Sequence, residues 1–278
     1  MIALWRMEEA SSSTRANASG TTCGTDCDLT NAGTVAKDTT NFVEGTASAD
    51  WDAATDILSC TDATCGTSGA ELDCVGDCTW GGWIRPTSDS TLRIIRKNTT
   101  TPGYMLFRGS TNDNFSCFVG DGTNQNTNMA NGSAPINEWH HAVCRLNDTT
   151  NTQQGFVDGV ASGASATQGG VAASTSTFQL GDATLPHVGE QDEIWVSNRS
   201  WSDAQICGEC SCGADGTVCL CDASDHTLFK ACTVDADCQT LSANGKCDTG
   251  SGKCEGKNAG SNPGCGDCTL PLCNAAAP

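Results

Sequence analysis

Residues 137–160 read NEWHHAVCRLNDTTNTQQGFVDGV. Two apolar runs follow the Trp-His-His triplet, and the second run ends in Asp-Gly. Short apolar runs bounded by turn residues are typical of strands, and Asp-Gly tolerates the positive φ that tight hairpin turns require. The stretch therefore predicts strands over Glu138–Leu146 and Gln153–Val157, with a turn at Asp158-Gly159.

The same pattern extends through residues 1–206, where short apolar stretches alternate with clusters of Gly, Asn, Asp, Thr and Ser. No long segment has a helical period, and Asp121-Gly122 is a second turn signal. About ten short strands at this spacing predict two packed antiparallel sheets, with one helical turn at Ser202–Cys207. The other expected strands are Ile2–Met7, Asp56–Leu58, Thr79–Ile84, Leu92–Arg96, Tyr104–Arg108, Phe115–Gly120, Thr177–Leu180 and Glu193–Asn198.

The charge of the chain limits its partners. Its 278 residues include 14 basic and 33 acidic side chains, a net charge of −19. Such a chain lacks the basic footprint that nucleic acid binding requires, and an anionic membrane surface would repel it. No segment is apolar for the roughly 18 residues that membrane insertion needs. MIALWRMEEA does not have the features of a signal peptide, so we expect either that a leader has been removed or that this sequence begins at the mature domain.

Cysteine content indicates an oxidising compartment. Eight of the 20 cysteines lie in residues 1–206 and twelve in residues 207–278, so each region can pair internally. We expect an extracellular or cell-surface protein with all or nearly all cysteines in disulfides and none on zinc. The pairs Cys60/Cys65 and Cys74/Cys78 are candidate loop staples. Cys207-x2-Cys210 and Cys265-x2-Cys268 have zinc-like spacing, but the composition favours disulfides.

The composition changes at Cys207. Residues 207–278 contain few large apolar side chains, so this segment cannot be stabilised by burial alone. We interpret it as a small, loop-rich domain stapled by disulfides, following a β domain over residues 1–206.

Six motifs, taken in order, resemble the laminin-G-like, concanavalin A-like jelly-roll domains of secreted and surface proteins. The resemblance implies an all-β, two-sheet antiparallel jelly-roll sandwich, and it makes the Trp-His-His stretch a scaffold strand. The motifs are ALWRMEE (3–9), TWGGWIRP (79–86), NEWHHAVCRL (137–146), GFVDGV (155–160), FQLGD (178–182) and GEQDEIWVSNRSWSDAQI (189–206).

Alternation along that strand separates the two histidines. Successive side chains of a strand point to opposite faces. Trp139, His141, Val143 and Arg145 would share one face, and His140 would lie on the other. His140 and His141 therefore cannot bind one ion, and we expect neither to be catalytic.

Other chemistry receives partial support. Some glycoside hydrolases of this fold carry a Glu-x-Asp-x-x-Glu strand, which Glu190 and Asp192 match, but the third position is Trp195. Half of a two-carboxylate mechanism is not enough, so we expect no enzyme. Many relatives hold one structural Ca²⁺ at the sandwich edge, and the resemblance implies Asp192 as a ligand, with Glu8 or Glu9.

Two functions remain open. One is a secreted, non-catalytic binding or adhesion module that recognises a glycan or a surface protein. The other is a structural subunit that assembles with copies of itself into a filament, sheath or appendage hardened by disulfides. We expect the seven tryptophans to lie in the core, which leaves no clear aromatic platform for a sugar.

One disulfide can be predicted by position. Cys117 and Cys144 are the only cysteines between Cys78 and Cys207, and both lie in strand-like runs. If the chain between them simply folds back, their strands would be neighbours at a distance suited to a bridge.

Overall fold

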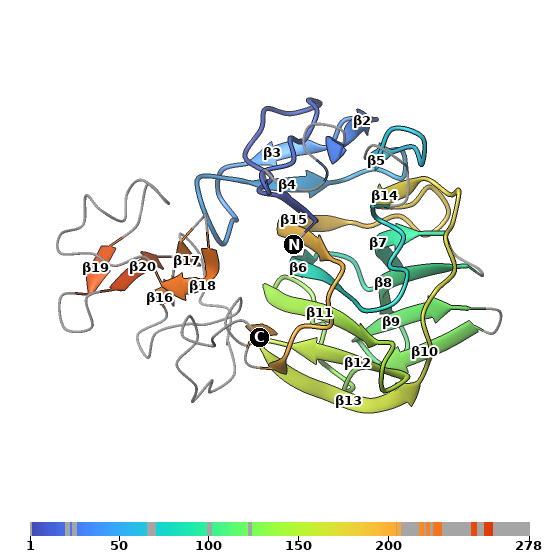
Figure 1. The fold of residues 1–278 in the computed structure, drawn as a ribbon. Helices are drawn as coiled ribbons and strands as arrows, with labels where there is room; N and C mark the ends of the chain where they lie inside the picture. The colour runs from blue at the N-terminus through green and yellow to red at the C-terminus, as the bar shows by residue number, and fades with distance from the viewer. Residues whose placement is uncertain are drawn as a thin grey trace.

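The computed structural model describes residues 2–19, 23, 27–65, 71–98, 102–121, 124–203, 205 and 206. Beyond these it describes only short strands of the C-terminal segment. The described part of residues 2–206 has an all-β fold of two antiparallel sheets, as the sequence predicted (Figure 1).

The larger sheet has eight strands in the order β13-β12-β11-β6-β15-β4-β3, with β1 paired to β15. β15 is thus a central strand, bordered by β6, β4 and β1. The bounds are β1 (Ala3–Trp5), β3 (Ala36–Asp38), β4 (Ser48–Trp51), β6 (Cys78–Pro86), β11 (His140–Asn147), β12 (Thr152–Val157), β13 (Val160–Thr167) and β15 (Gly189–Ser197).

The second sheet has seven strands in the order β10-β9-β8-β7-β14-β5-β2. Its strands are β2 (Thr30–Ala32), β5 (Ile57–Cys60), β7 (Leu92–Lys97), β8 (Gly103–Gly109), β9 (Asn114–Gly120), β10 (Asn124–Asn128) and β14 (Phe178–Leu180).

The C-terminal segment is described only as β16 (Thr217–Cys219), β17 (Cys221–Asp222), β18 (Asp225–Phe229), β19 (Lys246–Asp248) and β20 (Lys253–Lys257). The predicted disulfide stapling of residues 207–278 therefore lies outside the described residues.

Five strands of the sandwich, β2, β3, β4, β10 and β13, were not expected from the sequence. Four of them are edge strands and β4 lies next to one, and β13 is largely exposed. Edge strands with water on one side do not need alternating apolar residues, so Asn-rich β10 and small-residue β13 carry no such signal. Conversely, β1 is shorter than expected because Met7 adopts a positive φ of 61°.

The Asp-Gly turn forms as predicted between β12 and β13. Val157 pairs with Val160, and Asp158 and Gly159 both have positive φ, at 52° and 77°. The Asp158 carboxylate accepts the backbone N–H of His141 at 3.0 Å and lies 2.8 Å from Nδ1 of His140. His140 therefore holds a scaffold turn in place.

His141 lies on the opposite side of the same strand, as alternation predicted. Its ring packs against Trp83 with centroids 5.2 Å apart, and the residue is 1% exposed. Burial lowers its pKa from 6.5 to about 3, so this imidazole is neutral at physiological pH.

The eight cysteines of residues 1–206 form four disulfides, which include both predicted loop staples. Cys117 and Cys144 are joined, with Cα atoms 5.6 Å apart. The expectation that their strands are neighbours was wrong. β9 pairs with β8 and β10, whereas β11 pairs with β6 and β12 in the other sheet. The bridge therefore crosses the core and ties the two sheets together.

Removing this cross-sheet bridge should destabilise the protein more than removing a short one. The bridge spans 27 positions, so a Cys117→Ala/Cys144→Ala double variant should lose about 3–4 kcal/mol in the chain-entropy model. The Cys60→Ala/Cys65→Ala control closes a loop of only 5 positions and should lose about 2 kcal/mol by the same model. Denaturant unfolding measures both, and equal losses would contradict the cross-sheet role.

The buried His141 should make the protein sensitive to acid. Its pKa is about 3 when folded and 6.5 in the unfolded chain, so only the unfolded chain takes up a proton between these values. Stability should therefore fall as pH drops below 6.5, by on the order of 3 kcal/mol at about pH 4. A His141→Phe variant should lose this component, since all other groups titrate in both proteins. Parallel profiles of unfolding free energy against pH would refute it.

Candidate functional site

One row of side chains crosses the outer face of the seven-stranded sheet. Cys117, Tyr104 and Phe178 point into the core, so the residues next to them in sequence point outward. The pairing register aligns these outward residues from strand to strand. The row runs Asn126, Phe118, Met105, Arg96, Gln179, Ser59. The apolar centre of this row is buried, since Phe118 and Met105 are only 5% and 7% exposed.

Two arginines from β7 share a single carboxylate on this face. The guanidinium groups of Arg93 and Arg96 lie 3.2 and 2.8 Å from Oδ2 of Asp182, and each side chain is about a fifth exposed, at 23% and 21%. Asp182 is itself held by the backbone N–H groups of Thr184 and Leu185 at 2.6 and 2.9 Å. Two positive charges thus face one negative charge in a chain whose net charge is −19.

The electrostatics of these groups agree with their contacts. Burial acts to raise the pKa of Asp182, but hydrogen bonds from Leu185 and Thr184 and the two guanidiniums outweigh it and bring that pKa below its ordinary value. Burial and the nearby Arg93 lower the pKa of Arg96. Asp182 is therefore a fixed anion that holds both guanidiniums in place.

We call this surface the guanidinium face; it comprises Arg93, Arg96, Phe107, Gln179 and Asn126. Phe107 pairs with Arg93 across β7 and β8 and is half-buried, and Asn126 is exposed. Guanidinium and amide groups donate directed hydrogen bonds to hydroxyl and carboxylate oxygens, and a partly exposed ring adds apolar contact. These are the groups that a polar, oxygen-rich ligand requires.

The sequence did not point to this face. Arg93 and Arg96 are three positions apart, which in a regular strand puts them on opposite sides. A bulge between Arg93 and Ile95 inserts one extra residue, so both arginines reach Asp182 on the same face. The FQLGD motif contained Asp182, but nothing in it identified the arginine partners.

The predicted calcium ligands lie where β1 and β15 meet the segment 43–46. Asp192 is fully buried, and its Oδ2 accepts the N–H groups of Val43 and Glu44 at 2.8 and 3.0 Å. Glu8 accepts the N–H of Thr46 at 2.8 Å and the Thr46 hydroxyl at 2.5 Å. Both carboxylates therefore clamp the same segment.

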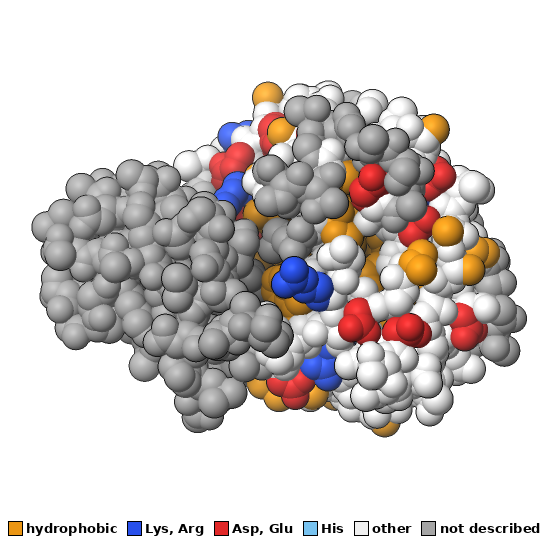
Figure 2. Space-filling view, in the orientation of Figure 1, with side chains coloured by type: hydrophobic (Ala, Val, Ile, Leu, Met, Phe, Trp, Pro, Cys, Tyr) orange, Lys and Arg blue, Asp and Glu red, His pale blue; other side chains and the backbone are white. Residues whose placement is uncertain are grey.

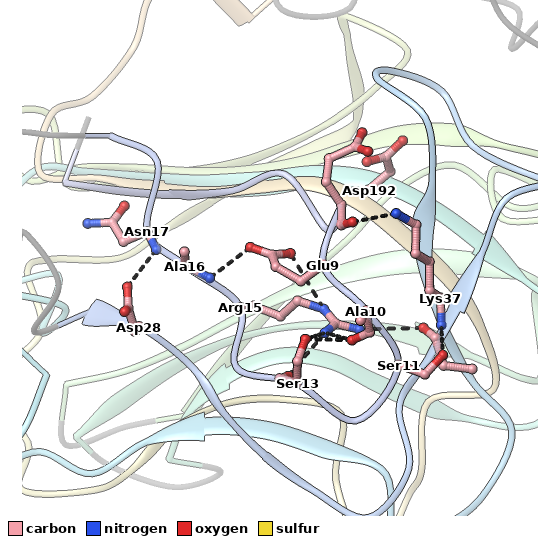
Figure 3. Close-up of polar contacts among 12 residues, drawn as sticks. Glu9, Ala10, Ser11, Ser13, Arg15, Ala16, Asn17, Asp28, Lys37 and Asp192 are labelled. Carbon is pink, nitrogen blue, oxygen red and sulfur yellow. Dashed lines mark hydrogen bonds and ion pairs between the residues drawn. The ribbon is translucent and has the colours of Figure 1, made fainter.

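Glu9, the alternative to Glu8, faces other partners. It accepts the N–H of Ala16 at 2.8 Å and lies 3.8 Å from the buried Arg15 (Figure 3). Lys37 reaches the same region, where its Nζ donates to the Glu8 carbonyl at 2.6 Å. The structure thus brings Asp192 and Glu8 to one segment and directs Glu9 to another contact.

Negative charge accumulates around Asp192. Burial and the neighbouring Glu193 raise its pKa well above the ordinary value, and burial also raises the pKa of Glu44, with a smaller contribution from Glu8. Within the described residues, no group of three or more His, Cys, Asp or Glu side chains has a metal-binding arrangement. Asp192 and Glu8 provide two carboxylates of a possible set, and calcium binding stays a prediction.

The partial hydrolase motif also takes structural roles. Glu190 is 5% exposed and accepts a hydrogen bond from Nη1 of Arg85 at 2.6 Å, while Asp192 accepts hydrogen bonds from backbone donors. Burial raises the pKa of Glu190 despite the Arg85 contact. Trp195, at the third motif position, is 2% exposed. Both carboxylates thus contact the protein's own groups, and neither faces open solvent.

All seven tryptophans are buried, as the sequence predicted. Acidic side chains are spread over the described surface that Figure 2 draws, and hydrophobic side chains gather there only in small groups. Among the described residues, no exposed tryptophan offers a sugar-stacking platform. In the same part of the chain, no helix is long and apolar enough to cross a membrane.

Several solved structures share this fold. The receptor-binding domain of botulinum neurotoxin C/D mosaic serotype is similar with a TM-score of 0.56 and 13% identity. The match covers 74% of this chain but only 49% of that one, so this chain spans about half its length. No curated protein sequence matches the chain.

Two similar structures come from enzymes. Domain 4 of an extracellular family 43 arabinanase from Geobacillus stearothermophilus, in complex with arabinotriose, has a TM-score of 0.55 and 13% identity, with 76% of this chain and 98% of that one covered. Trypanosoma rangeli sialidase has a TM-score of 0.51 and 16% identity, with 74% and 32% covered. At these identities the likeness is one of fold.

The family is shown by sequence. The family of laminin G domains described as the concanavalin A-like lectin/glucanases superfamily matches residues 61–207, which is more than half of the chain. This match spans β6 to β15 and includes both arginines of the guanidinium face. The chain belongs to the laminin G branch of the concanavalin A-like superfamily.

Proposed function

We propose that this protein is an extracellular, non-catalytic binding module that recognises a glycan through the guanidinium face. The observation that carries the proposal is the fixed pair Arg93 and Arg96, held by the buried Asp182 on an outer sheet face. Sugar hydroxyls and carboxylates accept hydrogen bonds from such donors without any aromatic platform.

The family and the structural neighbours support this proposal. The family is that of the concanavalin A-like lectins and glucanases, and one structural neighbour, matched over 98% of its own length, was solved with arabinotriose. Four disulfides in the described residues support an oxidising, extracellular location. If a glycan screen finds no ligand, recognition of a surface protein through the same face is the alternative that remains.

Arg96 should matter for ligand binding more than for folding. An Arg96→Ala variant should bind glycans about tenfold to a hundredfold more weakly, since a hydrogen bond to a charged group contributes about 1.5–3 kcal/mol. The control is Arg199→Ala, because Arg199 is exposed and lies outside this face. A glycan array followed by calorimetry on the best ligand measures both. Equal affinity of Arg96→Ala and wild type would remove the guanidinium face from the proposal.

The structural alternative rests on covalent linkage. Disulfides join every cysteine of residues 1–206, and one of them links the two sheets, which suits a subunit under mechanical load. A subunit of an extracellular filament would form long assemblies from the purified native chain. Negative-stain imaging and light scattering distinguish the two functions, since a monodisperse particle of 28.6 kDa favours the binding module.

We further propose one structural Ca²⁺ beside Asp192, with Glu8 as a second ligand. Burial is the main cause of the raised pKa values of Asp192 and Glu44, and repulsion from Glu193 and Glu8 adds to it. A bound cation would stabilise the ionised carboxylates against both effects, which supports this proposal. A ligand that binds only the folded state adds about 2.7 kcal/mol at a hundredfold excess over Kd. Melting temperatures in Ca²⁺ and in EGTA should therefore differ by several degrees. Identical curves, together with no calcium by elemental analysis, would rule the ion out.

A further inference from the structure

A lysine points into the core at one end of the sandwich. Lys97 is the last residue of β7, and it pairs with Tyr104 on β8 and Phe178 on β14. Both partners are fully buried core residues, and the Lys97 side chain is 1% exposed. Lysine is rarely placed in such surroundings unless its amine has close partners.

Two carboxylates meet this amine. Oδ1 of Asp73 lies 2.5 Å from Nζ of Lys97, and Oδ1 of Asp62 lies 2.8 Å from it. The Asp73 side chain is 3% exposed, whereas that of Asp62 is 24% exposed. The two carboxylates therefore differ in their access to water, with one enclosed beside the amine and one open to solvent.

Covalent and hydrogen-bonded neighbours fix all three groups. Asp62 lies within the short loop closed by Cys60 and Cys65, and Asp73 immediately precedes the Cys74–Cys78 disulfide. The Tyr104 hydroxyl donates to the carbonyl of Leu72 at 2.8 Å, which holds the chain next to Asp73. Fixed reactants react far faster than free ones, because their encounter no longer costs translational and rotational entropy.

The ion pair itself is costly. Removing an ammonium and a carboxylate from water carries a large desolvation penalty that their mutual attraction only partly offsets. An amide made from the two groups carries no charge and avoids that penalty. The surroundings of Lys97 and Asp73 thus favour the condensed product over the separated ions.

We propose that Lys97 and Asp73 condense into an intramolecular isopeptide bond, with Asp62 as the catalytic carboxylate. Asp62 takes a proton from the Lys97 ammonium, and the free amine attacks Cγ of Asp73. A bond forms between Nζ and Cγ, and the C–O bond of the Asp73 carboxyl breaks. Nitrogen loses a second proton as the amide forms, and Asp62 passes both protons in turn to the departing oxygen, which leaves as water. The ammonium and carboxylate become one amide and one water, so charge and atoms balance without oxidant or cofactor.

The bond would link the two sheets a second time. Asp73 lies in the segment leading into β6 of the eight-stranded sheet, and Lys97 ends β7 of the seven-stranded sheet. Unlike the Cys117–Cys144 bridge, this link survives reduction. The two sheets would then stay cross-linked near Asp73 and Lys97 in a reducing environment.

Mass spectrometry of the full chain tests the bond directly. After complete reduction and alkylation, the intact protein should be lighter by one water than the mass expected for its sequence with every cysteine alkylated. Tryptic mapping should find Lys97 uncleaved and joined to the peptide that contains Asp73. A chain of the full alkylated mass, with Lys97 cleaved by trypsin, would show a plain ion pair and overturn the proposal.

Variants separate the roles of the three residues. Lys97→Met and Asp73→Ala should each restore the missing water, and Lys37→Met, at another lysine of the sandwich, should leave the mass loss unchanged. Asp62→Asn keeps the shape of the catalytic group. Most of this variant should lack the Lys97–Asp73 bond when it is purified in the same way as the wild type. Fragment ions that place the link on Asp62 would overturn the assignment of Asp73. Full linkage in Asp62→Asn would overturn the catalytic role of Asp62.

Discussion

Aromatic packing between the two sheets is the interaction on which the described sandwich depends. Trp5 of β1 stacks on Phe178 of β14 with centroids 5.2 Å apart, and Trp80 of β6 packs on Tyr104 of β8 at 5.0 Å. Because side chains alternate, these inward rings determine which residues of the same strands face outward. A slip of one residue in β7 or β14 would turn Arg96 or Gln179 into the core. The guanidinium face therefore exists in its present form only while this packing holds the register.

The sequence predicted the parts of the fold that depend on apolar alternation. The strands from β6 to β9, the turn at Asp158-Gly159 and the opposite directions of His140 and His141 all follow from local pattern. Edge strands such as β10 and β13 escaped prediction because water satisfies one side of them and no apolar pattern is needed. The pairing of Cys117 with Cys144 could be deduced by elimination, but its path across the core depends on a crossover that no local signal shows.

The candidate site was harder to predict than the fold. A single bulge in β7 brings Arg93 and Arg96 to one face, and a one-residue insertion in pairing leaves no mark in the sequence. The acidic residues of the partial hydrolase motif, Glu190 and Asp192, are held by protein donors. Sequence reasoning gives the residue types available for chemistry, whereas their accessibility depends on long-range pairing.

Buried ionisable groups act in opposite directions on stability. His187 is buried beside Trp51 with a pKa lowered to about 3, so its burial disfavours the folded state as pH falls below 6.5. Asp192 has a raised pKa, so the folded protein binds its proton more tightly than the unfolded chain and gains stability as pH falls through that raised value. Acidification thus destabilises the folded state through the buried histidines and stabilises it through Asp192, so the two effects on stability partly cancel in mild acid.

The arrangement of the sheet edges limits how copies of this domain could join. On one side the long outer strands β13 and β10 lie against each other, where a side chain at Gly163 would clash with the Asn128 carbonyl and the Ser162 hydroxyl accepts the N–H of Ala130 at 3.0 Å. On the other side the outer strands β2 and β3 have only three residues each. Backbone pairing of a neighbouring chain would find at most a few donors and acceptors there. Growth of this domain into a continuous sheet is therefore disfavoured, and any assembly of the described region would have to proceed through side-chain surfaces.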